Sequence, residues 1–206
     1  DGDALVSTIS LSNGNALDSS NLDSLRLFTS KDSNGLVGVT VTATDPSGLS
    51  VSTTLDINIL PVNDAPLHNS GGNVSATEED DYSKSWATAI SVGPTNENTQ
   101  TLSFIVNSIS DSSLFSTFPA IDPNGVLSFV GAHNQTGSAT VFYYLKDTGD
   151  TLNGGVNVSA TNSFTISLAN TNDKPVLKDS ISNLIVVEDS GLVSIARFDS
   201  LFLDPD

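Results

Sequence analysis

The chain has 206 residues, 37% of them hydrophobic and 6% aromatic, and its 24 acidic and 7 basic residues give a formal net charge of −17 at pH 7. This charge argues against nucleic acid and anionic membrane surfaces as partners, because both are negatively charged themselves. The chain has no cysteine, which excludes disulfides and thiolate zinc sites, and it has no apolar run of the roughly 18 residues needed for membrane insertion.

The first half of the chain predicts a β-hairpin. Val39, Val41 and Ala43 alternate with threonines and so share one face of a strand. Pro46-Ser47-Gly48 predicts a turn, and alternation resumes from Val51 to Ile59. We therefore expect two paired strands with one face in the core and the other in water.

The second half repeats this plan, with strands predicted over Ala139 to Leu145 and Phe164 to Leu168. Counting back from Asp45 and Asp147 places Gly35 opposite Gly137. Four further strands are predicted at Trp86 to Val92, Gln100 to Asn107, Gly125 to Val130 and Asn183 to Val187. Convincing helical periodicity is lacking, so the predicted fold class is all-β.

A junction motif divides the chain into repeats. Pro61-Val62-Asn63-Asp64-Ala65-Pro66 returns as Thr171-Asn172-Asp173-Lys174-Pro175, and 109 residues (173 − 64) separate the two aspartates. This spacing suits one β-sandwich. Three domains are predicted: an incomplete sandwich over 1–62, a complete one over 67–171, and the first strands of a further unit over 176–206.

The two ends of the sequence, Asp204-Pro205-Asp206 and Asp1-Gly2-Asp3, read as halves of one acidic loop. We therefore expect further copies of this unit to follow head to tail. Three arrangements remain open: covalent tandem repetition in one chain, separate subunits in which 176–206 adds strands to 1–62 of a neighbour, or ends cut across domains that pair within one molecule or stay frayed.

These motifs resemble the tandem cadherin-like, immunoglobulin-like repeats of large bacterial surface adhesins. The residues that carry the resemblance are Asn63-Asp64-Ala65-Pro66, Asp45-Pro46-Ser47-Gly48, Glu188-Asp189-Ser190-Gly191 and the acidic ends. The resemblance implies tandem Greek-key immunoglobulin-like (cadherin-like) β-sandwiches, stacked end to end and stiffened by calcium at their junctions. It also implies an extracellular location on the cell surface.

Calcium is chemically reasonable because a hard cation takes six to eight oxygen ligands, which acidic junctions supply. By the family pattern, the ligands at the first junction are Asp45, Asn63, Asp64, Glu79 and Asp80. At the second junction they are Asp147, Asn172, Asp173, Glu188 and Asp189. A third site would form from Asp204, Asp206, Asp1 and Asp3 when two ends meet. The alternative at each loop is a plain turn without an ion.

Catalytic chemistry is not expected. No serine lies in a Gly-x-Ser-x-Gly elbow, and His68 and His133 lack the local spacing of a zinc site. Glu78 and Glu79 are adjacent rather than placed across a cleft, as a glycosidase requires. We expect the chain not to be an enzyme.

Two functions follow from these observations. The first is a structural repeat of an extracellular filament or adhesin stalk. The alternative is a calcium-dependent carbohydrate-binding module that binds cell-surface glycans. The alternative requires exposed aromatic rings, such as Trp86 beside Tyr82, that stack on sugars.

Overall fold

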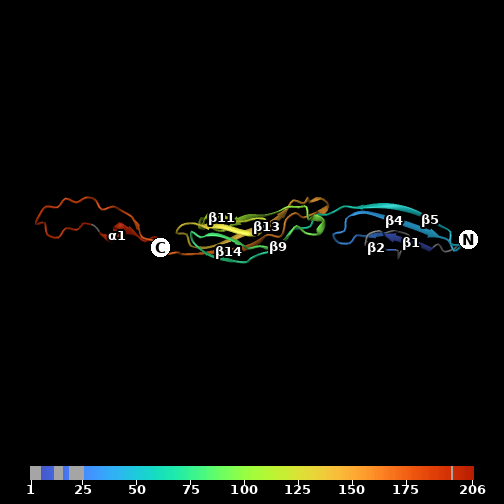
Figure 1. Cartoon of the computed structure of the whole chain (residues 1–206), viewed down its shortest axis with the longest axis horizontal. Helices are drawn as coiled ribbons and strands as arrows, with labels where there is room; N and C mark the ends of the chain where they lie inside the picture. Colours follow the sequence, from blue (N-terminus) through green and yellow to red (C-terminus); the bar gives the residue numbers. More distant parts are fainter. Residues whose placement is uncertain (1–5, 12–15, 19–25, 196) are drawn as a thin grey trace. The chain divides into compact units, whose positions relative to one another are not determined.

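The computed structural model describes residues 6–11, 16–18, 26–195 and 197–206, and its regular structure is almost entirely β-strand (Figure 1). The chain forms two compact units, which are described separately. Unit 1 contains residues 1–65, 92–100 and 148–157, and unit 2 contains residues 66–91, 101–147 and 158–206. The predicted all-β class is confirmed.

Unit 1 is built on a three-stranded antiparallel sheet. Strands β1 (Val6–Leu11), β4 (Gly35–Thr44) and β5 (Ser50–Ile59) lie in the order β1-β4-β5. Strands β2 (Ala16–Asp18) and β3 (Arg26–Phe28) pair with each other, and two 3-10 turns, η1 (Thr95–Glu97) and η3 (Leu152–Gly154), complete the unit. The predicted hairpin is confirmed, since β4 and β5 pair without a bulge from Gly35–Ile59 to Thr44–Ser50.

The turn between β4 and β5 is closed by Asp45. Its carboxylate oxygen Oδ1 accepts hydrogen bonds from the backbone N–H of Ser47 at 3.0 Å and of Leu49 at 2.9 Å, and from the Ser47 hydroxyl at 2.7 Å. These bonds, the Ser47 hydroxyl bond most strongly, lower the pKa of Asp45 below its ordinary value. Asp45 therefore acts here as a turn former.

The core face of β5 is uncovered. Leu55 pairs with Val39 and Ile57 with Val37 across the hairpin, and both valines are fully buried. Leu55, however, is 52% exposed, and Val51 on the same face is 72% exposed. The expected apolar face exists, but the β5 half of it lies largely in solvent.

Unit 2 is a β-sandwich. Its four-stranded sheet has the order β10-β13-β14-β7, formed by β10 (Leu102–Ile109), β13 (Gly137–Asp147), β14 (Asn162–Ala169) and β7 (Val74–Thr77). Its three-stranded sheet has the order β11-β12-β8, formed by β11 (Phe115–Ile121), β12 (Val126–Gly131) and β8 (Asp81–Ser85). A 3-10 turn, η2 (Ser112–Leu114), precedes β11, and β6 (Leu67–Asn69) pairs with β9 (Thr88–Ser91). Strand β7 pairs in parallel with β14, although the two strands lie far apart in the sequence. Such pairing between distant segments is expected in a sandwich.

One continuous core joins the two sheets of unit 2. Tyr143 and Ile166 come from the four-stranded sheet and Phe129 from the three-stranded sheet, and all three are almost completely buried. Trp86 packs on Phe164 with ring centroids 4.4 Å apart, and its indole N–H donates to the Gly72 carbonyl at 2.8 Å. The buried tryptophan is therefore both packed and hydrogen-bonded, as a core position demands.

Residues 176–206 contain little regular structure. Strand β15 (Val176–Leu177) pairs with β16 (Phe202–Leu203), and a single turn of helix, α1 (Phe198–Leu201), precedes β16. The strand predicted over 183–187 is not formed, and its apolar side chains are exposed. The predicted domain limits remain a prediction.

Candidate metal centre

The candidate site of unit 2 contains a buried carboxylate. Glu78 directly follows β7, where its backbone N–H donates to the Ala169 carbonyl at 2.9 Å. Its side chain is 2% exposed, and Oε1 accepts from the backbone N–H of Thr171 at 3.0 Å. The other oxygen, Oε2, is buried and has no hydrogen-bond partner among the described residues. Burial of a charge that is left half unpaired is costly, and a cation beside Oε2 is one arrangement that would compensate it.

Glu79 faces the other way. Its φ of 60° is left-handed, and its carboxylate pairs with Nδ1 of His133. The end of β12 comes close to this turn, because a Cβ built on Gly131 would lie 2.8 Å from the Glu79 backbone N and 3.1 Å from the Glu78 Cα. A glycine at 131 is therefore required to bring the His133 loop beside the two glutamates.

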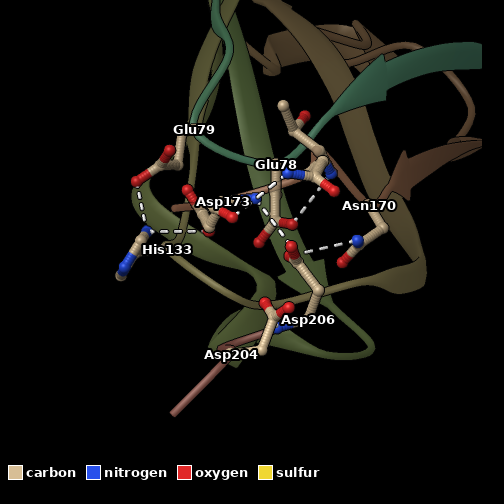
Figure 2. A network of polar contacts seen from close by, with 9 residues as sticks. Glu78, Glu79, His133, Asn170, Asp173, Asp204 and Asp206 are labelled. Atoms are coloured by element: carbon tan, nitrogen blue, oxygen red, sulfur yellow. Dashed lines mark hydrogen bonds and ion pairs between the residues drawn. The ribbon is translucent and has the colours of Figure 1, made fainter. Parts of the chain in front are cut away.

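Asp173 lies between these two glutamates and a fourth carboxylate. Its backbone N–H donates to Oδ2 of Asp206 at 2.6 Å, and Oδ1 of Asp206 accepts from the Asn170 amide at 3.2 Å. Oδ2 of Asp173 is 3.9 Å from Nδ1 of His133. Figure 2 shows these side chains converging from the β7 turn, the β12 loop and the chain after β14. We refer to Glu78, Glu79, His133, Asp173 and Asp206 as the Asp173 cluster.

The Asp173 cluster offers two overlapping cation positions. Ligand atoms of Glu78, Asp173 and Asp206 lie within 4.8 Å of one another, and so do those of Glu79, His133 and Asp173. The first set contains only oxygens, which suits calcium, while the second includes an imidazole nitrogen. Desolvation, followed by the negative charge of Glu79, raises the pKa of Asp173.

A second group of polar residues lies in unit 1. The Asn63 amide N–H donates to the Val156 carbonyl at 2.7 Å, and its Oδ1 accepts from Gln100 at 2.6 Å. Oε1 of Glu97 accepts from the backbone N–H of Asp64 at 2.8 Å. Glu97 is 4% exposed, and its Oε2 and the Oε1 of Gln100 are buried without hydrogen-bond partners in the described part of the chain. We refer to Asn63, Asp64, Glu97 and Gln100 as the Asn63 cluster.

The structure distributes the predicted first-junction residues over several places. Asn63 and Asp64 lie in the Asn63 cluster, Asp45 closes its hairpin turn, and Glu79 belongs to the Asp173 cluster. The backbone N–H of Asp80 donates to the Thr77 carbonyl in the turn between β7 and β8.

The second and third predicted sets are also divided. Asp173 and Asp206, expected at different sites, come together, whereas Glu188 and Asp189 lie in an exposed turn. The remaining members lie as follows: Asp147 is buried at the end of β13, Asn172 is exposed beside Asp173, Asp204 is exposed near Asp206, and Asp1 and Asp3 lie outside the described residues.

Sequence reasoning missed Glu78 and His133 as members of the cluster. A signal for Glu78 exists in the strand pattern, since Val74, Ala76 and Glu78 are in phase and the first two face the core. No local signal exists for His133, because only the approach of the β12 loop brings it to Glu79.

Several solved cadherin structures are similar in fold to this chain. No family model matches the sequence, and no curated protein matches it. Human protocadherin-24 EC1-2 (Form II) aligns with a TM-score of 0.55 and 15% identity over 82% of this chain and 83% of that one. Protocadherin gamma B2 extracellular cadherin domains 1–5 align with a TM-score of 0.51 and 20% identity over 82% and 34% of the two chains.

Protocadherin gamma B2 domains 3–6 align with a TM-score of 0.50 and 19% identity over 86% of this chain and 45% of that one. This chain therefore spans less than half the length of the gamma B2 structures. At these identities the likeness concerns the fold, and the expected cadherin-like sandwich is confirmed.

Two further features bear on function. Trp86 and Tyr82 are buried in the core of unit 2, so neither ring is available to stack on a sugar. Among the described residues, no helix has the length and apolar character needed to cross a membrane.

Proposed function

We propose that this chain is a structural repeat of an extracellular filament or adhesin stalk, in which calcium stiffens the junctions and copies follow head to tail. The observation that carries the calcium part is the buried Glu78 carboxylate, whose unpartnered Oε2 lies with the carboxylates of Asp173 and Asp206. An oxygen-only set of this kind suits a hard divalent cation.

Calcium at the Asp173 cluster would fasten the chain that leaves the sandwich. Glu78 is held by the sandwich through its backbone bond to Ala169 of β14, whereas Asp173 and Asp206 belong to the segment after β14. Three carboxylates repel one another without a cation. The ion therefore converts a repulsive junction into a cross-linked one, which is the role expected in a stalk.

The Asn63 cluster supports the same role in unit 1. Asp64 and Asp173 occupy equivalent places in the repeated junction motif, and Glu97 and Gln100 present buried, unpartnered oxygens beside Asn63 and Asp64. We assign this cluster to a second calcium ion.

The extracellular setting is supported by fold and composition. The two similar gamma B2 structures are named as extracellular cadherin domains, with several domains in tandem. A formal charge of −17 is compatible with a setting in which calcium neutralises carboxylates. No observation favours the glycan-binding alternative, given the burial of Trp86.

Calcium titration of Glu78→Gln tests this proposal. In isothermal titration calorimetry we expect the affinity of the Asp173 cluster to fall roughly 10-fold or more, because a charged ligand is lost. In EDTA the same variant should melt above the wild type, because a buried unpaired charge is removed. This opposite pair of effects identifies a metal ligand rather than a merely structural residue.

Asp56→Asn is the matched control, since Asp56 is an exposed carboxylate on β5 outside both clusters. It should bind calcium as the wild type does. Absence of calcium-dependent heat in the wild type, together with equal melting in calcium and in EDTA, would sink the calcium proposal.

A further inference from the structure

Strand β5 has a free edge as well as an uncovered face. It is the last strand in the order β1-β4-β5, and no strand among the described residues pairs with its outer edge. Apolar side chains on its core face, Val51 and Leu55, are exposed. A long edge strand with an exposed apolar face is a template for strand addition.

Unit 2 shows what covers the equivalent strand. The β13–β14 hairpin repeats the β4–β5 register: Val39–Leu55 corresponds to Val141–Phe164, and Val37–Ile57 corresponds to Ala139–Ile166. Both β4 and β13 begin at a glycine with positive φ, 112° at Gly35 and 138° at Gly137. Strand β14 is therefore the counterpart of β5.

In unit 2 the outer edge of β14 is occupied. Strand β7 pairs with it in parallel, Val74 opposite Ile166 and Ala76 opposite Leu168. Phe164, the counterpart of Leu55, is 3% exposed. The described residues pair no strand equivalent to β7 with β5.

Residues 184–195 carry the features of β7 and β8. The chain turns at Glu188–Asp189 as it does at Glu78–Glu79, and the second residue of each turn is left-handed, with φ of 65° at Asp189 and 60° at Glu79. This correspondence aligns Leu184 and Val186 with Val74 and Ala76 of β7, and Leu192 with Tyr82 of β8.

The aligned side chains differ in burial. Val74 and Tyr82 are buried in the sandwich, whereas Leu184 and Val186 are about half exposed and Leu192 is fully exposed. The segment therefore has the pattern of two sandwich strands without a sandwich to cover.

We propose that residues 184–195 of one copy of this chain add to strand β5 of a second copy, in the parallel register Leu184–Ile57 and Val186–Ile59. The occupant is a second copy because the segment and the edge belong to the same chain and match the β7–β14 pairing residue by residue. Parallel addition of the part that corresponds to β7 supplies main-chain hydrogen bonds to β5. The part that corresponds to β8 would then cover the apolar face of β5, because β8 belongs to the sheet that packs against the equivalent face in unit 2. The contact is heterologous, so it propagates head to tail.

Strand addition also brings a carboxylate to the Asn63 cluster. Glu188 corresponds to Glu78, and Asp64 corresponds to Asp173, with which Glu78 forms a cation position. Glu188 of the added segment thus takes the place beside Asp64 that Glu78 takes beside Asp173. This last step rests on the proposed calcium function, whereas the strand addition does not.

Cysteine cross-linking between two variants of the full chain tests the register, because the natural sequence has no cysteine. A chain with Ile57→Cys is mixed with a chain with Leu184→Cys under mild oxidation. We expect a disulfide-linked heterodimer on a non-reducing denaturing gel. Ile185→Cys is the matched control, since the register places residue 185 on the opposite face of the strand, and it should cross-link several-fold less.

Sedimentation velocity of the unmodified chain over a concentration series tests the assembly. We expect head-to-tail oligomers in EDTA as well as in calcium, and Leu55→Asp should weaken association by about 10-fold or more, because it places a charge in the buried contact. Leu55 is exposed in the single chain, so this variant should still fold. A chain that stays monomeric at every concentration, or a double variant Ile57→Cys/Leu184→Cys that closes only within one chain, overturns the proposal.

The same experiment distinguishes the proposed calcium ligand Glu188 from the proposed strand addition. We expect calcium to strengthen association, and Glu188→Gln to remove that gain while leaving association in EDTA unchanged. If Glu188→Gln associates in calcium as the wild type does, the Glu188 ligand is refuted and the strand contact stands. If calcium still binds the Asp173 cluster of a strictly monomeric chain, the strand contact is refuted and the calcium part of the proposed function stands.

Discussion

The β4–β5 hairpin of unit 1 and the β13–β14 hairpin of unit 2 share one register and differ in burial. Val39 and Leu55 face each other in the first as Val141 and Phe164 do in the second. Leu55 is largely exposed and Phe164 is buried.

The difference arises outside the hairpins. In unit 2 strand β7 covers the edge of β14, and the three-stranded sheet covers its face. In unit 1 the described residues supply no strand for the β5 edge. Hairpin register is therefore a local property, while burial of the same side chains is decided by strands from elsewhere in the chain.

The largest expected effect is a difference in stability loss between equivalent core positions of the two hairpins. Ile166→Ala in β14 should cost about 2–5 kcal/mol of unfolding free energy, because it opens a cavity in a closed core. Ile57→Ala at the equivalent position of β5 should cost about half of that or less, because this side chain is only partly buried. Chemical denaturation of the two variants measures the difference; equal losses would mean that the β5 face is covered in solution.

Alanine substitution at two glycines tests whether the β7 turn positions the ligands of the metal centre. Gly131→Ala should cost about 1–3 kcal/mol, because its Cβ meets the backbone of Glu78 and Glu79. Calcium affinity should fall with it, since the same turn positions the ligands.

Gly38→Ala in β4 is the matched control, because its Cβ meets only Oδ1 of Asp56, at 3.7 Å. It should be close to neutral in both denaturation and calcium titration. An unaltered calcium affinity in Gly131→Ala would contradict the assignment of the β7 turn to the site.

The smallest expected effect concerns pH in EDTA. Hydrogen bonds lower the pKa of Asp45, so its contribution to stability is present above the ordinary value of 3.8 and is lost as the pH falls through the lower folded value. The pKa of Asp173 is raised, so its contribution is favourable below 3.8 and is lost as the pH rises through the higher folded value.

We therefore expect Asp45→Asn to lower the melting temperature at pH 7 and Asp173→Asn to raise it. The Asp173 difference should shrink below pH 3.8, where this carboxyl is protonated in the folded and unfolded states, and the Asp45 difference should shrink as the pH falls further, through the lower folded pKa of Asp45. Thermal melts of the two variants at both pH values check the signs, and a destabilised Asp173→Asn at pH 7 would contradict the repulsion described for its cluster.

Much of the fold was predictable from alternation. The strands over 39–44, 51–59, 139–145 and 164–168 all lie within observed strands. Gly35 and Gly137, which the repeat spacing placed opposite each other, both begin strands. The short strands β7 and β8 were not predicted, because four or five residues with serine and lysine carry a weak periodic signal. Because β7 was not predicted, the alternation that places Glu78 on the same side of the strand as Val74 and Ala76 was not recognised either.

The candidate site was less predictable than the fold. The motifs identified Asp173 and Asp206 as candidate ligands but assigned them to different sites, and they gave His133 no role. The structure joins all three in one cluster, because the β12 loop and the chain after β14 meet at the β7 turn.

The sequence alone determined the all-β class, the two hairpins and the acidic junctions, because strand alternation, turn residues and charge act over a few neighbouring positions. Only the tertiary structure decided that Glu78 is buried with a free oxygen, that His133 reaches Glu79, and that β5 lacks the cover that β14 receives from β7. These properties depend on which distant segments lie side by side, and strand order in a sandwich joins segments that no local pattern connects.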